Sequence, residues 1–140
     1  MAQPIPEWTE ETTRQFHLAF KSGSQIANNY AEAGFAVAIH QVLYPHDVTK
    51  HIEARLKKFK PVKVFLNPSL EDCLQRNGER TNKEFDTRIL DAAIKAMHPA
   101  MNEQMAASTD WIVIDTSHQS VEDTVNEIIE KAGLTLETNK

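Results

Sequence analysis

Three arginines that follow a short apolar segment are the residues of this chain best suited to chemistry. They are Arg76, Arg80 and Arg88, and the apolar segment is VKVFL at 62–66. Each guanidinium donates hydrogen bonds in a fixed fork that matches the oxygens of a phosphate group. Arg76 and Arg80 are four residues apart, so one helix would place both on the same face. Their positive charges would repel each other there, and an anion bound between them would offset that repulsion.

The same arginines have an ordinary alternative. Acidic residues surround them in the sequence, and on a solvated surface each arginine could pair with one of these neighbours. The acidic residues are Glu71, Asp72, Glu79, Glu84 and Asp86. A Gly-rich phosphate loop of the form G-x-x-x-x-G-K-[ST] would favour the phosphate-binding interpretation, but the sequence does not contain one. The chain has glycines at positions 23, 34, 78 and 133, and these cannot form that loop.

Polar residues also stand at the ends of two other apolar segments, FAVAIHQVL (35–43) and WIVID (111–115). Ligands bind beyond the carboxyl ends of the strands in an open parallel sheet, so these residues are candidate ligand contacts. They are His40 and Gln41 in the first segment, and Asp115, Thr116 and Ser117 at the end of the other. Asp115 could instead accept hydrogen bonds from the backbone amides of the next turn. His40 could instead be a hydrogen-bonded core histidine.

Alternating strands and helices must hold these residues in place. The expected strands are the three apolar segments at 35–43, 62–66 and 111–115, and helical patterns separate them. Such an order favours parallel pairing with right-handed crossovers, and hence an α/β fold with a three-layer parallel sheet and flanking helices. We therefore expect a single domain over residues 1–140, with a loose tail at 134–140.

Capping residues mark where the helices begin and end. The expected starts are Thr9, Asp47, Ser69 and Ser120, the last two as S-x-x-D caps. The expected ends are Gly34 and Gly133. Gly78 predicts a break within the arginine-bearing stretch, and Pro99 predicts a kink or split in the helix after it.

Composition excludes several classes of function. The net charge of −5 argues against general attraction to nucleic acid or to an anionic membrane. No apolar run approaches the ~18 residues of a membrane span. One cysteine and the absence of an H-E-x-x-H pattern give no zinc site, so no metal ligand is predicted. The single cysteine also fits a reducing cytoplasm, which is the expected location.

Three segments, taken in order, resemble the later part of a P-loop small-molecule kinase. The resemblance is closest to the group of chloramphenicol phosphotransferase-like and tunicamycin-resistance-like proteins. The segments are IANNYAEAGFAVAIHQVLYP, VKVFLNPSLEDCLQRNGERTNKEFDTRI and DWIVIDTSHQSVEDTVNEIIEKAGL. The resemblance covers residues 16–133, and the order of the segments carries it more than any single motif.

The resemblance implies a nucleotide-binding transferase that moves the γ-phosphoryl group of ATP, with Mg²⁺, to a small hydroxylated acceptor. The implied catalytic residues are the lid arginines Arg76 and Arg80, which would contact ATP phosphates and stabilise the transferring group. The implied cofactor contacts are Arg88 as a further lid arginine, and Asp115, Thr116 and Ser117 at the adenine. The implied substrate contacts are His40 and Gln41.

Two departures from the kinase pattern change this expectation. The chain contains no G-x-x-x-x-G-K-[ST], and His40 stands where many relatives have an acidic residue. Without the phosphate loop, the chain lacks the segment that binds most of the ATP phosphates in these enzymes. We therefore expect a phosphotransferase that is truncated or impaired in ATP binding, and that is catalytically incomplete as a lone chain. The alternative is a non-catalytic binding or interaction module that retains the kinase scaffold.

The missing loop also affects the sheet. The family's N-terminal strand would be absent together with the phosphate loop, which leaves a strand edge to be covered. We expect either that segment 35–43 pairs directly with 62–66, or that a second copy of the chain covers the edge in a homodimer.

Overall fold

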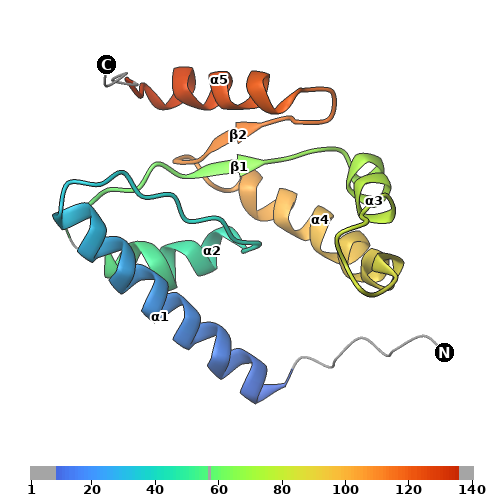
Figure 1. The fold of residues 1–140 in the computed structure, drawn as a ribbon, viewed down its shortest axis with the longest axis horizontal. Coiled ribbons are helices and arrows are strands. Elements are labelled where there is room, and N and C mark those ends of the chain that lie inside the picture. The colour runs from blue at the N-terminus through green and yellow to red at the C-terminus, as the bar shows by residue number, and fades with distance from the viewer. Residues whose placement is uncertain (1–8, 57, 136–140) are drawn as a thin grey trace. The chain divides into compact units, whose positions relative to one another are not determined.

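The computed structural model describes residues 9–56 and 58–135, and the chain divides into two compact units (Figure 1). The first unit is Pro4–Pro61, and the second contains Val62–Lys140. The expectation of a single domain stays a prediction. Residues 136–140 of the expected loose tail lie outside the described residues.

The first unit is built around the long helix α1, Glu10–Glu32. The helix begins where the Thr9 hydroxyl accepts a hydrogen bond of 3.1 Å from the backbone amide of Thr12, which confirms the predicted start. It ends before Gly34, whose φ of 88° lies in the left-handed region that glycine adopts without strain. The predicted end is therefore confirmed as well.

Short helical turns follow in the same unit. They are the α-helical turn α2 (Pro45–Asp47), the π-helical turn η1 (Val48–Ile52) and the 3₁₀ turn η2 (Glu53–Arg55). The predicted start at Asp47 is wrong, because the first turn already begins at Pro45, whose fixed φ suits a first helical position. The unit's core consists of Phe20, Ala27, Ile52 and Leu56, with Phe16, Leu43 and Val48 packed against it.

Segment 35–43 takes part in no strand pair among the described residues, so the strand predicted there is wrong. Most of its large side chains are exposed, with 62% of Phe35 and 61% of Val42 open to solvent. A continuous apolar run indicates that a segment should be buried, but backbone hydrogen bonds to a partner are what make a strand.

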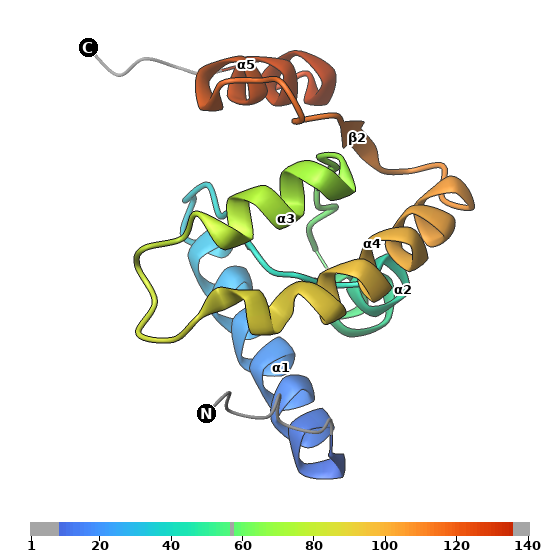
Figure 2. The ribbon, with the colours of Figure 1, turned by 90° about the vertical axis from the view of Figure 1, so that its right-hand side faces the viewer.

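The second unit contains two short strands and most of the remaining helices. Strand β1 (Val64–Leu66) pairs in parallel with strand β2 (Ile112–Ile114), with Val64 opposite Ile112 and Leu66 opposite Ile114. The helical elements are α3 (Leu70–Gly78), η3 (Thr87–Leu90), α4 (Asp91–Ala106) and α5 (Val121–Ala132). Helix α5 lies on one side of the two strands and α4 on the other (Figure 1), and Figure 2 shows the same unit turned by 90°.

The mixed α/β class and the parallel pairing are thus confirmed. Two of the three expected strands form the sheet of the described residues, so a three-layer sheet is not shown. No helix within the described ranges is long and apolar enough to cross a membrane.

Local signals set the ends of these helices. The hydroxyl groups of Ser69 and Ser120 each accept a backbone amide hydrogen bond of 3.1 Å, from Asp72 and Asp123 respectively, so both S-x-x-D caps are confirmed. Helix α5 ends at Gly133, whose φ is 61°. Helix α4 is not split at Pro99 and runs continuously through it. The residue is exposed, so water can hydrate the carbonyl group that the proline leaves without an amide partner.

Candidate functional site

The two loops that leave the strands at their carboxyl ends are hydrogen-bonded to each other. The backbone amide of Asn67 donates to the carbonyl of Ile114 at 2.8 Å, which extends the strand pairing by one step. The backbone amide of Ser69 then donates to the hydroxyl of Ser117 at 2.9 Å. These bonds fix loop 67–69 against the loop that begins at residue 115, where sequence reasoning placed candidate ligand contacts.

Asp115 closes a tight turn at the end of β2. Its carboxylate accepts from the hydroxyl of Ser117 at 2.5 Å and from the backbone amide of the same residue at 2.9 Å. These two bonds, the hydroxyl first, lower the pKa of Asp115, and the side chain is exposed. The turn-capping role that the sequence left open is therefore present. The carboxylate remains an anion at neutral pH and can accept further donors from a ligand.

Helix α3 carries Arg76 to this same loop. The guanidinium nitrogen Nη2 donates to the backbone carbonyl of Thr116 at 2.7 Å, and Thr116 itself is buried. Guanidinium has five N–H donors, so one bond to a carbonyl leaves most of its fork available. The structure thus brings together Arg76, Asp115, Thr116 and Ser117 from the predicted set.

Arg80 does not share a helical face with Arg76. Helix α3 ends at Gly78, and Glu79 caps it, so Arg80 lies beyond the helix and is exposed. The predicted break at Gly78 is confirmed, and this break makes the same-face expectation wrong.

Arg88 forms an ion pair with Asp86, as the surface alternative predicted. The guanidinium donates to both carboxylate oxygens, from Nε to Oδ1 at 2.9 Å and from Nη2 to Oδ2 at 2.7 Å. The bonds from Arg88 lower the pKa of Asp86 to about 2. Both side chains are exposed, so this pair contributes little to stability.

A buried clamp closes the base of the exposed loop 79–86, which carries Arg80. The side-chain amide of Asn77 donates to the backbone carbonyl of Thr87 at 2.6 Å and to Asp91 Oδ1 at 2.9 Å. The Thr87 hydroxyl donates in return to the backbone carbonyl of Asn77. Asn77 and Thr87 are buried, with 3% and 4% of their surface exposed. Sequence reasoning missed this clamp, because nothing local in N-G-E marks the asparagine as buried.

The loop after β1 has a second support, which sequence reasoning also missed. His98 and Asn102 of α4 form hydrogen bonds to residues of loop 67–69. The two residues are polar and stand four positions apart in a helix rich in Ala and Met. This pattern is the sequence signal that could have identified them as a support for the loop.

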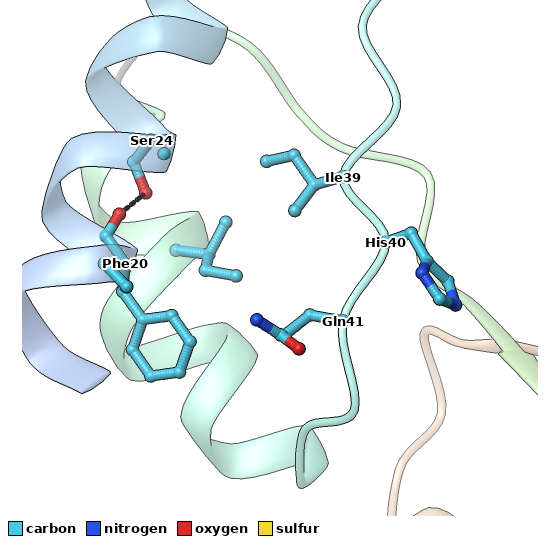
Figure 3. Close-up of a pocket in the computed structure, with 8 residues that line it drawn as sticks. Phe20, Ser24, Ile39, His40 and Gln41 are labelled. Carbon is cyan, nitrogen blue, oxygen red and sulfur yellow. Dashed lines mark hydrogen bonds between the residues drawn. The ribbon is translucent and has the colours of Figure 1, made fainter. Parts of the chain in front are cut away.

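His40 and Gln41 lie in the first unit, beside a pocket of about 140 Å³. In Figure 3 the side chains of Ile39 and Gln41 point toward α1, where Phe20 and Ser24 line the opposite wall, whereas His40 points away. Successive side chains of an extended segment alternate in direction, which accounts for this difference. His40 is exposed, so the core-histidine alternative is wrong.

Among residues 9–56 and 58–135, no group of three or more His, Cys, Asp or Glu side chains could hold a metal ion. At the strand ends, Asp115 contributes an exposed carboxylate. The residues that the structure describes therefore do not by themselves fit a Mg²⁺ site.

A probable thymidylate kinase from Methanococcus aeolicus is 32% identical to this chain over 80 residues. The match covers 55% of the chain and 41% of that protein, so the chain spans about two fifths of this curated relative's length. No family model matches the chain. No solved structure matches it either. The similarity supports the kinase resemblance in its coarse form, and the chloramphenicol phosphotransferase-like subgroup stays a prediction.

Proposed function

We propose that this chain is part of an ATP-dependent phosphotransferase and supplies the portion that closes on the nucleotide. The observation that carries the proposal is the bond from Arg76 to the Thr116 carbonyl at the carboxyl ends of two parallel strands. Ligands of open parallel sheets bind at this edge. The similarity to a probable thymidylate kinase gives independent support for a kinase.

The charges around the loop after β2 suggest how a nucleotide would lie. The Asp115 carboxylate repels phosphate groups and accepts hydrogen bonds, so an adenine amino group or a ribose hydroxyl suits residues 115–117 better than a phosphate does. After its bond to Thr116, Arg76 still has N–H donors that could bind the phosphates.

Arg80 would complete the contact with the phosphates. The residue lies on the exposed loop 79–86, whose base is fixed by Asn77, so a closing movement of the loop would bring its charge toward that of Arg76. Two guanidinium groups near the transferring phosphoryl group would neutralise the charge that develops there. Arg88 would join them only after leaving its pair with Asp86.

The acceptor contacts that the resemblance implies, His40 and Gln41, are residues of the first unit. Both residues line the pocket, but the side chain of Gln41 points into it and that of His40 points away (Figure 3), so Gln41 is the stronger of the two proposed substrate contacts. A small hydroxylated molecule is the acceptor that the sequence resemblance implies. The relative's name adds a second candidate, thymidylate.

Isothermal titration of the chain with ATP, with and without Mg²⁺, tests the proposal. Binding should weaken about tenfold in Arg76→Ala, the loss expected for one or two bonds to a charged group. Arg14→Ala is the matched control, because Arg14 is an exposed arginine of α1 that pairs with Glu11. The absence of wild-type binding at millimolar ATP, or equal losses in both variants, would contradict the proposal.

A second candidate function is a binding module that keeps the kinase scaffold without catalysis. The exposed apolar side chains of segment 35–43 favour it, because contiguous exposed apolar surface marks interaction sites. Sedimentation equilibrium distinguishes a homodimer from a monomer. If segment 35–43 is the contact, Val42→Lys should shift a dimer to a monomer, whereas Lys95→Gln on α4 should not.

A further inference from the structure

We propose that His98 and Asn102 of helix α4 are positioning residues, which hold loop 67–69 in the conformation that the nucleotide site requires. The importance of this loop for ATP binding rests on the proposed function. The positioning itself can be measured without any nucleotide, so the two can fail separately.

Asn102 and Asn67 exchange a pair of hydrogen bonds through their side-chain amides. Asn67 Nδ2 donates to Asn102 Oδ1 at 2.7 Å, and Asn102 Nδ2 donates to Asn67 Oδ1 at 3.2 Å. Asn102 Nδ2 also donates to the backbone carbonyl of His98 at 2.9 Å. The last bond fixes which way the Asn102 amide faces, because only its nitrogen can donate.

His98 holds the next residue of the loop. Its Nε2 lies 2.9 Å from the carbonyl oxygen of Pro68. A carbonyl can only accept, so the proton must be on Nε2. His98 and Asn102 are both half-buried and stand one helical turn apart, so α4 presents two donors to consecutive residues of the loop.

Loop 67–69 connects this support to the candidate site. The backbone amide of Asn67 donates to the carbonyl of Ile114. The backbone amide of Ser69 donates to the hydroxyl of Ser117, which in turn donates to Asp115. Ser69 also caps α3, the helix that carries Arg76. A shift of the loop would therefore move both the turn at residue 115 and the helix that brings the guanidinium to it.

This support consists of hydrogen bonds to a loop, which gives it a signature different from that of core packing. A glutamine at position 98 can still donate from its amide nitrogen to the Pro68 carbonyl, whereas a phenylalanine of similar size cannot. At position 102, aspartate can accept from Asn67 but cannot donate to Asn67 or to His98. Two comparisons therefore separate the loss of a hydrogen-bond donor from a change in side-chain volume. They are His98→Gln against His98→Phe, and Asn102→Asp against Asn102→Ala.

The first measurement is hydrogen exchange of the ligand-free protein, resolved at the backbone amides of Asn67, Ser69 and Ser117. We expect exchange about fivefold faster in His98→Phe and in both Asn102 variants, and within about twofold of wild type in His98→Gln, because one bond contributes about 1 kcal/mol. Glu103→Gln, an exposed change on the same helix, is the control. Unchanged exchange in His98→Phe and Asn102→Asp would overturn the inference.

The second measurement is ATP titration of the same variants. Affinity should fall about tenfold with His98→Phe and recover with His98→Gln, while the melting temperatures of these two variants stay close. If the wild type binds no ATP, the proposed function fails, and the exchange result still decides whether the loop is positioned. Binding in His98→Phe equal to wild type would overturn the positioning role.

Discussion

The guanidinium of Arg76 donates a 2.7 Å hydrogen bond to the backbone carbonyl of Thr116, which joins helix α3 to the loop after strand β2. Forty residues of sequence separate the two partners. Thr116 is buried, and its neighbour Asp115 is exposed. The bond therefore holds Arg76 against the loop that carries the exposed Asp115, at the carboxyl ends of the parallel strands.

Replacing Arg76 should affect stability as well as binding. Arg76→Lys keeps the charge but loses the fork, so we expect a loss of about 1 kcal/mol in the free energy of unfolding, the usual contribution of one hydrogen bond. Urea denaturation measures this difference. Arg88→Lys is the comparison, because its pair with Asp86 is fully exposed and should change the free energy little. Similar losses in the two variants would mean that the bond to Thr116 is not maintained in solution.

Asn77→Asp should be among the most destabilising single changes in the second unit. The new carboxylate would be buried beside the Thr87 carbonyl and the Asp91 carboxylate, with no donor to replace the Asn77 amide. We expect a loss of about 3 kcal/mol at pH 7, because a buried charge is left uncompensated. Asn126→Asp on the exposed face of α5 is the control, and urea denaturation is again the measurement. A loss below about 1 kcal/mol would contradict the buried clamp.

Local chemistry explains what the sequence could predict. The starts at Ser69 and Ser120 and the end at Gly133 depend on residues within one turn, and the structure confirms all three. The parallel direction of the strands also followed from the order of elements, although the sequence did not identify 62–66 and 111–115 as the pair. At the site, the turn at Asp115 was one of two interpretations that the sequence allowed, because the aspartate precedes backbone amides that it can bind.

Longer-range relationships explain the failures. Segment 35–43 has the composition of a buried strand, but a strand needs a partner that its own sequence does not identify. Arg80 was placed on a helical face by spacing alone, although Gly78 ends the helix two residues earlier. The supports at Asn77 and Asn102 join residues 10 and 35 positions away, and a local pattern does not identify the partner of such a bond.

Two glycines should respond in opposite directions to alanine. Gly23 lies inside α1, and an added Cβ would meet no atom within 4 Å, so Gly23→Ala should stabilise the chain by about 0.5–1 kcal/mol through helix propensity. Gly133 has a φ of 61°, so Gly133→Ala should destabilise it by about 1 kcal/mol. Thermal or urea unfolding of the two variants checks both signs. A loss of stability in Gly23→Ala would indicate that the space beside α1 is filled in solution.

The stability of the first unit should fall as the pH drops below about 6.5 because of His51. The residue is buried, stacked on His17 with a ring separation of 4.4 Å and on Phe20 at 5.7 Å. Burial lowers the pKa of His51 from 6.5, and the neighbouring His17, Lys50 and Arg55 lower it further, while Asp47 opposes them. The unfolded chain thus takes up a proton at a higher pH than the folded chain.

The sign of the effect follows from this difference. Above pH 6.5 both states hold a neutral imidazole at position 51, so its contribution is constant. As the pH falls from 6.5 toward the lowered pKa of the folded state, the unfolded state binds more protons, and the free energy of unfolding decreases. Urea denaturation between pH 5 and 8 should therefore show a decline that is smaller in His51→Phe, which cannot be protonated. His46→Phe, an exposed histidine of the same unit, is the control, and an equal decline in wild type and His51→Phe would contradict the assignment to His51.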